Sequence, residues 1–141
     1  MTRIQGDILD RTLLFAETVV ELVDSMATRT SGAVIGRQLA RAGTSIGANV
    51  HEADAAFSES DFIYSMNVAR KEALEARYWL QLARRTKLID ATRAETAIRE
   101  ATELIKILTT IVRKSQQRRK EYTQTHKRVN VPTDGAIPKS S

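Results

Sequence analysis

The spacing of small and apolar residues between positions 62 and 83 constrains the fold of this chain more than any other feature. Seven residues there alternate steps of four and three: Phe62, Met66, Ala69, Ala73, Ala76, Leu80 and Ala83. This spacing places the whole set on one face of an α-helix, as in helices that pack side by side. Alanines on that face let a neighbouring helix approach closely. The pattern predicts a helix from about residue 59 to residue 86, packed inside a helical bundle.

Three further segments show helical periodicity. We expect helices over about residues 7–26, over about residues 33–57 with Phe57 among their apolar positions, and from about residue 90 or 92 onward. The expected apolar seam of the last helix is Ile98, Ala101, Ile105, Leu108, Val112 and Ser115. No stretch alternates like a β-strand, and the two prolines, Pro132 and Pro138, follow all the periodic segments.

Helix-capping residues mark the starts of these segments. Asp7 is the expected N-cap of the first helix, and Ser58 with Asp61 forms a capping box for the third. Thr92 with Glu95 has the same pattern before the fourth. Because short links between long amphipathic helices favour antiparallel neighbours, the predicted fold is all-α, an antiparallel up-and-down four-helix bundle.

Size and composition agree with a single domain. The chain has 141 residues, of which 42% are hydrophobic and none is cysteine, so disulfides and thiolate metal sites are excluded. No apolar run approaches the roughly 20 residues that a membrane-spanning helix needs, and the N-terminus lacks the apolar core of a signal peptide. We expect a cytoplasmic protein without a membrane partner.

A narrow polar stripe follows the second expected helix. Arg41, Ser45, Asn49 and Glu52 stand at intervals of four, four and three, which places them on one helix face. Such a stripe is either a solvated face or a contact with another helix or subunit. The small and apolar residues beside it favour the contact, and in that case the stripe specifies assembly rather than chemistry.

Three segments together resemble a known family. They are residues 41–53, residues 60–63 and residues 69–80, the last of which ends in Tyr78, Trp79 and Leu80. In this order and spacing they are similar to the bacterial four-helix-bundle family, also called the 23S ribosomal RNA intervening-sequence protein family. The likeness extends over about residues 8–115.

The resemblance implies a fold, an assembly and a set of partners. The expected fold is a small up-and-down bundle, and the expected assembly is a ring-like homo-oligomer of five subunits without an established enzymatic activity. Related proteins are accessory subunits of the reverse transcriptases of diversity-generating retroelements, where a basic ring contacts the enzyme and nucleic acid. The residues assigned to the family motif or the oligomer are Arg41, Ser45, Asn49, Glu52, Tyr78 and Trp79.

The excess positive charge lies at the C-terminal end of the chain. Residues 1–112 contain 14 Lys or Arg against 15 Asp or Glu, whereas residues 113–141 contain 8 against 2. The net charge of +5 therefore comes from the second part. We expect a four-helix bundle over residues 1–118 followed by a flexible basic tail over residues 119–141.

Such basic residues can bind the phosphates of RNA or DNA by releasing counterions. The candidates on the third and fourth helices and the tail are Arg70, Lys71, Arg77, Arg84, Arg85, Arg113, Lys114, Arg118, Arg119 and Lys120. The alternatives are a solubilising end and, less favoured, a membrane surface. Because the sequence shows no recognition helix, zinc-finger spacing or aromatic platform, we expect nucleic-acid binding to tolerate many sequences.

Residues that could carry catalysis are sparse. His51 and Glu52 begin like a zinc-protease helix, but Ala55 stands where the second histidine would be needed. We therefore expect neither an enzyme nor a cofactor. The favoured hypothesis is a non-catalytic oligomeric adaptor for nucleic acid, or for a nucleic-acid enzyme such as a reverse transcriptase. The alternatives are a protein-interaction scaffold and a metal-dependent activity of His51, Glu52 and Asp54.

Overall fold

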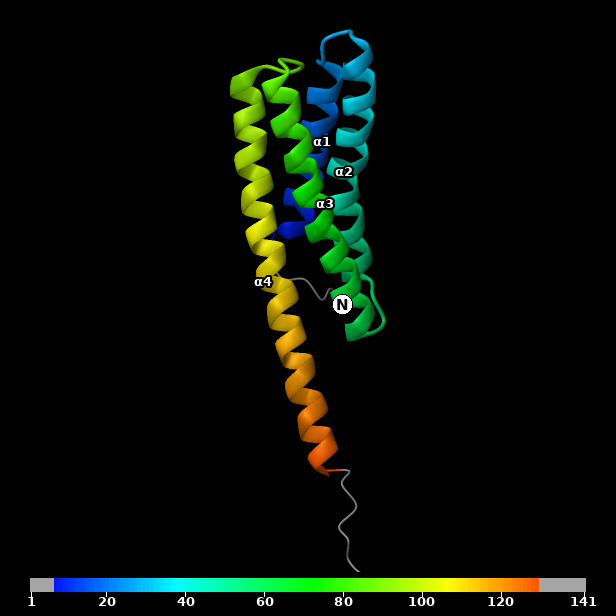
Figure 1. The fold of residues 1–141 in the computed structure, drawn as a ribbon. Helices are drawn as coiled ribbons and strands as arrows, with labels where there is room; N and C mark the ends of the chain where they lie inside the picture. The colour runs from blue at the N-terminus through cyan, green and yellow to red at the C-terminus, as the bar shows by residue number, and fades with distance from the viewer. Residues whose placement is uncertain (1–6, 130–141) are drawn as a thin grey trace, which may run out of the picture.

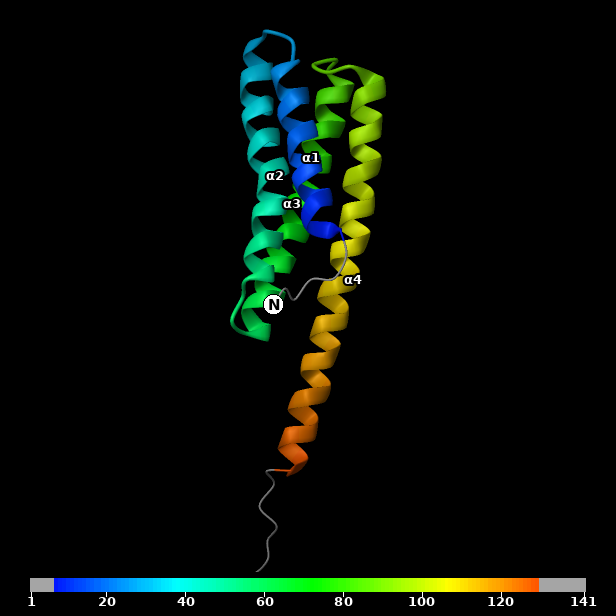
Figure 2. The ribbon, with the colours of Figure 1, turned by 180° about the vertical axis from the view of Figure 1, so that it is seen from behind.

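The computed structural model of the chain describes residues 7–129, with side chains as far as residue 127. These residues form four helices: α1 (Ile8–Asp24), α2 (Thr30–Asp54), α3 (Glu59–Arg85) and α4 (Ala91–Val129). Neighbouring helices run antiparallel in one bundle (Figure 1), and the view from behind shows α1 between α2 and α4 (Figure 2). No strand occurs between residues 7 and 129. The predicted all-α, up-and-down four-helix bundle is confirmed.

The cap predicted for α3 is confirmed, and the others differ. Ser58 Oγ accepts a hydrogen bond from the backbone N–H of Asp61 at 3.1 Å. Asp7 precedes α1 but makes no capping bond with its side chain. The cap of α4 is Asp90, whose Oδ2 accepts a bond from the N–H of Arg93 at 3.0 Å. The predicted Thr92–Glu95 box is wrong because α4 has already begun when the chain reaches Thr92.

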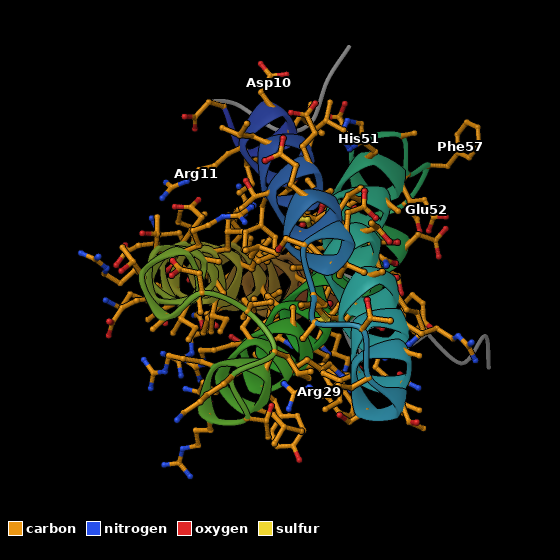
Figure 3. All side chains as sticks on the ribbon, turned by 90° about the horizontal axis from the view of Figure 1, so that it is seen from above. Asp10, Arg11, Arg29, His51, Glu52 and Phe57 are labelled. Carbon is orange, nitrogen blue, oxygen red and sulfur yellow. The ribbon has the colours of Figure 1, made fainter. Side chains whose placement is uncertain are left out.

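The second helix lies about three residues earlier than predicted, beginning at Thr30 and ending at Asp54. Phe57 is consequently in the turn before α3 and is fully exposed, which makes its predicted place among the apolar helix positions wrong. Figure 3 shows its ring pointing away from the bundle. The apolar spacing does reach Phe57, but the chain leaves the helix before that residue can turn inward.

The core confirms the seam of α3 and corrects that of α4. All seven predicted positions of α3, from Phe62 to Ala83, are buried. In α4, Ile98 and Ile105 are only partly buried. Its buried row is Ala94, Ala97, Ala101, Leu104, Leu108, Val112 and Ser115. The two apolar rows of α4 lie one residue apart, and packing against α3 and α1 buries the row that contains Leu104 and leaves Ile98 and Ile105 at its margin.

Glycines in α2 let α1 approach closely. A Cβ atom on Gly43 would lie 2.7 Å from both methyl groups of the buried Val19, and one on Gly47 would lie 3.3 Å from Thr12 Oγ1. A Cβ at the first distance does not fit without movement of Val19. Gly43 and Gly47 therefore reflect close packing between these two helices.

Two further contacts join the halves of the bundle. The loop before α2 meets the loop after α3, where Ala27 N–H donates to Leu88 O at 3.1 Å. On the side of α1 that faces α4, Arg11 makes a bidentate pair with Glu100, with N–O distances of 2.6 and 3.0 Å. The hydrogen bond from Arg11 to Glu100 raises the pKa of Arg11 against the opposing effect of burial. These contacts join α1 and α2 to α3 and α4.

The fourth helix continues beyond the bundle, and Figure 1 shows its C-terminal part projecting past the other three helices. Every described side chain from residue 116 to residue 127 is exposed. The prediction of a flexible tail is therefore wrong for residues 119–129, which are helical, and residues 130–141 lie outside the described part. The helix persists because this stretch contains Arg, Lys, Gln and Glu, all good helix formers, and no glycine or proline.

Candidate nucleic-acid interface

Three of the predicted basic residues of α3 form one row at the edge between α3 and α4. Arg70, Arg77 and Arg84 recur every seven residues and are all half-buried. Arg77 donates to Thr102 Oγ1 of α4 at 3.4 Å, and Arg84 pairs with Glu95 of α4 at 3.3 Å. Two members of this α3 edge row are therefore held against α4, whereas Arg70 bonds to Asn67 of its own helix. A carboxylate already neutralises the charge of Arg84.

The remaining two basic candidates of α3 do not join this row. Lys71 and Arg85 each follow a row member by one residue, so they lie about 100° further around the helix, and both are exposed. The structure therefore divides the predicted α3 cluster between an edge that faces α4 and the outer surface of α3.

The basic segment, residues 113–127 of α4, has a large excess of exposed positive charge. Glu121 is the only carboxylate of this segment. Its six cations are all exposed: Arg113, Lys114, Arg118, Arg119, Lys120 and Lys127. Three of these cations, at positions 113, 120 and 127, are seven residues apart and therefore lie on one line along the helix. That line continues the face of Thr102, eleven residues before Arg113, to which Arg77 is bonded. The α3 edge row and the line of Arg113, Lys120 and Lys127 thus share one side of α4.

An aromatic pair in the basic segment was not predicted from the sequence. Tyr122 and His126 stand four residues apart, with ring centroids 3.8 Å apart and an angle of 30° between the ring planes. Tyr122 remains 64% exposed. The sequence feature that could have indicated this pair is the spacing of Tyr122, which follows the buried Ser115 by seven residues and so continues the core seam of α4.

A groove lies beside this pair, between the start of α3 and the basic segment. Its volume is about 550 Å³, and its lining residues are Glu59, Phe62, Arg118, Arg119 and Tyr122. Phe62 is 6% exposed and forms an apolar floor. Arg118 also donates to the buried Ser115 Oγ at 3.2 Å, which fixes this arginine at the mouth of the bundle.

The family motif links α2 to α3 within the chain. The guanidinium of Arg41 pairs with Glu75 and, at 3.3 Å, with Glu72. Glu75 also accepts a hydrogen bond from Trp79 Nε1 at 3.2 Å. The bond from Arg41, opposed by burial and supported by Trp79, lowers the pKa of the Glu75 carboxyl. The same bond raises the pKa of Arg41.

The other motif residues lie around this network. Ser45 and Asn49 are half-buried, and their side chains donate to carbonyls of α2, those of Arg41 and Ser45. Glu52 is exposed. Tyr78 is 56% exposed and meets the edge of Trp79, with ring centroids 5.0 Å apart. Arg41 and Trp79 are thus brought together, while Glu52 lies apart from them.

The residues considered for a metal do not converge. His51 Nδ1 lies 2.8 Å from the carbonyl oxygen of Gly47, one turn earlier. His51 and Glu52 are exposed on α2, as Figure 3 shows. Within residues 7–129 no group of three or more His, Cys, Asp or Glu side chains is placed to hold a metal ion.

An apolar row lies uncovered on α1. Leu13 and Val20 are seven residues apart and 53% and 45% exposed, and the half-buried Ala16 lies between them on the same face. Leu14 is 62% exposed on the side that faces α4. None of the described helices is both long enough and apolar enough to cross a membrane.

The fold and these surfaces define a small helical-bundle protein with a basic helical projection. The sequence profile of the 23S rRNA-intervening sequence proteins matches residues 5–110, and the chain belongs to that family. A crystal structure of a protein of unknown function from the S23 ribosomal protein family of Bacteroides thetaiotaomicron VPI-5482 is 40% identical in sequence, with a TM-score of 0.70. The likeness covers 74% of this chain and 97% of that chain. No curated protein matches this chain.

The family match and the basic segment occupy different parts of the sequence. The profile ends at residue 110, whereas the basic segment begins at residue 113. The family profile therefore describes the bundle with its motif residues and does not extend over the basic segment.

Proposed function

We propose that this protein is a non-catalytic oligomeric adaptor that binds RNA or DNA through the basic segment of α4. The observation that carries the proposal is the exposure of six cations on one projecting helix with a single carboxylate among them. A helix with a rise of about 1.5 Å per residue presents these cations over roughly 20 Å, a length comparable to several nucleotides. Charge of this density attracts a phosphate backbone and releases its counterions.

The α3 edge row extends the proposed surface onto the bundle. Arg70 and Arg77 lie along the same side of α4 as Arg113, Lys120 and Lys127. Because the contacts would be made to phosphates rather than to base edges, binding would tolerate many sequences and weaken as salt rises. A nucleic-acid enzyme, such as the reverse transcriptase of a retroelement, is the protein partner that we propose for such an adaptor.

We propose further that the protein acts as a homo-oligomer, a ring of five as the family resemblance implies. The uncovered row of Leu13, Ala16 and Val20 supports a subunit contact, since apolar side chains on one exposed face gain from burial. Repeating the basic segment around a ring would raise the effective affinity through avidity.

The test is the native mass of the particle with and without a short structured RNA, across a salt series. The variant Arg118→Gln with Arg119→Gln removes two cations of the basic segment, and Arg29→Gln with Arg37→Gln removes two exposed cations near the start of α2 as a matched control. We expect uptake of RNA at low salt and release at high salt. The first variant should lower the slope of log affinity against log salt by about 0.7–0.9 for each phosphate that it no longer neutralises, and the control should leave the slope unchanged. A particle indifferent to RNA at low salt would contradict the proposal.

The second candidate function is a protein-interaction scaffold, which the same α1 row supports. Its test is the native mass of Leu13→Gln with Val20→Gln, compared with Val34→Gln, a change at an α2 residue that is 58% exposed. Assembly through α1 predicts a smaller particle for the first variant alone. An oligomer that binds no RNA would favour the scaffold over the adaptor.

A further inference from the structure

We propose that the groove between α3 and the basic segment holds an unpaired base of a single-stranded nucleic acid. In this site Tyr122, backed by His126, is the stacking surface, and Arg118 and Arg119 contact the adjoining phosphates. The inference rests on the proposed function and adds a ligand class and a binding mode to it.

The aromatic pair lies on the core-facing side of α4, beyond the end of the bundle. Leu108, Ser115 and Tyr122 follow one another at intervals of seven, and His126 lies one turn further on the same face. Leu108 and Ser115 are buried by the other helices, but Tyr122 lies beyond their ends and is 64% exposed. The core-facing side of α4 therefore continues past the bundle with aromatic residues and no covering helix among the described residues.

The groove combines apolar and cationic side chains. Phe62 gives it an apolar floor, Tyr122 gives it an aromatic wall, and the two arginines stand beside them. A volume of about 550 Å³ lies inside the range of roughly 300–1,000 Å³ that is usual for small-ligand sites. A nucleotide matches this combination, because its base is flat and apolar on both faces while its phosphate is an anion.

The charges around the groove select among possible occupants. Arg118 and Arg119 flank Tyr122 on its two sides, so a second copy that presented the same face would bring like charges together. Arg118 and Arg119 lie on the α4 side of the groove, where they attract the phosphate backbone of a nucleic acid. A polyanion with exposed flat rings therefore fits better than another α4 helix.

Stacking on Tyr122 distinguishes single strands from duplexes. Bases in a duplex are already stacked and paired, so a tyrosine ring reaches their faces only if the stack opens. A single strand presents each base face at little cost. The stacking surface should therefore favour single strands, whereas the cations of the basic segment attract both forms.

The experiment measures binding of the full-length protein to fluorescein-labelled oligothymidylate and to the corresponding oligothymidylate–oligoadenylate duplex. The variants are Tyr122→Ala, Tyr122→Phe, which keeps the ring, and Tyr64→Ala, which removes a 72% exposed tyrosine of α3 as a control. We expect Tyr122→Ala to raise the Kd for the single strand by about fivefold to a hundredfold. Tyr122→Phe and Tyr64→Ala should leave that Kd close to its original value.

The salt dependence separates stacking from charge. Tyr122→Ala should leave the slope of log Kd against log salt unchanged, because it removes no cation that faces a phosphate. Arg118→Gln with Arg119→Gln should lower that slope by about 0.7 for each phosphate of a single strand that is no longer neutralised. Thermal unfolding of each variant checks that the bundle is still folded. Because Tyr122 is exposed, its replacement should not change the unfolding temperature.

Each other outcome overturns the inference in a distinguishable way. If Tyr122→Ala binds single strands normally while the arginine variant does not, the inference fails and the proposed function stands. If the unmodified protein binds neither oligonucleotide at low salt, both fail. If Tyr122→Ala reduces the native mass, the face belongs to a second copy of the chain, and the inference is wrong.

Discussion

Arg41 and Trp79 belong to different helices, yet both donate hydrogen bonds to the carboxylate of Glu75. This explains why residues from two separate sequence segments occur together in the family resemblance. The pair across α2 and α3 is partly exposed, so its contribution to stability should be modest, on the order of 0.2–1 kcal/mol. Its pH dependence is the feature that a measurement can isolate.

The first prediction is that Arg41→Gln destabilises the protein at neutral pH but less so in acid. Arg41 lowers the pKa of Glu75 in the folded state, so the pair is stabilising above the ordinary carboxyl pKa. That contribution disappears as pH falls through the lowered value, when Glu75 becomes protonated. Urea unfolding near pH 7 should show a loss of about 0.5 kcal/mol, and the loss should shrink near pH 3. Arg37→Gln, on the exposed face of the same helix, is the control. An equal loss at both pH values would argue against the ion pair.

The second prediction concerns the closest approach of α1 and α2. Gly43→Ala gains about 1 kcal/mol of helix propensity, but its Cβ would lie 2.7 Å from the methyl groups of Val19, which is fully buried. Overpacking of this kind costs roughly 1–3 kcal/mol because a β-branched side chain cannot easily move aside. We expect a net loss of about 1 kcal/mol. Thermal or urea unfolding measures it.

Gly47→Ala is the matched comparison for that prediction. The nearest atom to its Cβ is Thr12 Oγ1 at 3.3 Å, so the neighbour must give by only a small amount. The gain in helix propensity should then offset most of the strain. If both variants were equally stable, close packing at Gly43 would not be the reason for glycine there.

At the scale of an element, the end of α3 contains backbone strain that the sequence does not indicate. Lys87 has φ of 59°, a left-handed conformation that glycine usually adopts. Leu88 N–H bonds to Ala83 O at 2.9 Å, and Lys87 N–H bonds to Arg84 O at 3.1 Å. These two bonds form a Schellman motif, which closes the helix and turns the buried Leu88 toward the core.

The third prediction is that Lys87→Gly stabilises the protein. Glycine adopts positive φ without the steric cost that a lysine side chain carries, so we expect a gain of about 0.5–1 kcal/mol in the free energy of unfolding. Thr86→Gly is the contrasting change, since Thr86 has φ of −90° and gains nothing from glycine. A loss of stability in Lys87→Gly would contradict this explanation of the turn.

Periodicity was sufficient to predict where the helices lie in the sequence, but not which face of each helix is turned toward the core. In α3 one apolar row is present, so the seam from Phe62 to Ala83 was predicted without error. In α4 two apolar rows lie one residue apart, and only the packing decides that Leu104 is buried while Ile105 is partly exposed. Local patterns also compete at helix ends: Asp90 and Thr92 both suit an N-cap, and the structure uses Asp90.

At the scale of the whole molecule, the candidate site was only partly visible in the sequence. Counting charged residues along the sequence located the basic segment, because the net charge of a segment can be calculated without knowing its structure. The composition of residues 119–141 suggested a flexible tail. The good helix formers between residues 119 and 129, however, keep α4 helical to Val129. The groove could not be foreseen at all, since Phe62 and Tyr122 meet only when α3 and α4 pack.

The last prediction is that the bundle is independent of its projection. A chain ending at residue 116 lacks most cations of the basic segment but keeps the whole core row of α4 through Ser115. Since residues 116–127 are exposed throughout, their removal exposes little more than the groove side of Phe62. The shortened protein should therefore unfold at nearly the same temperature and keep the same number of subunits as the full chain. Its affinity for RNA at low salt should fall to that of the α3 edge row together with Arg113 and Lys114. A large drop in unfolding temperature would instead make the projection part of the folding unit.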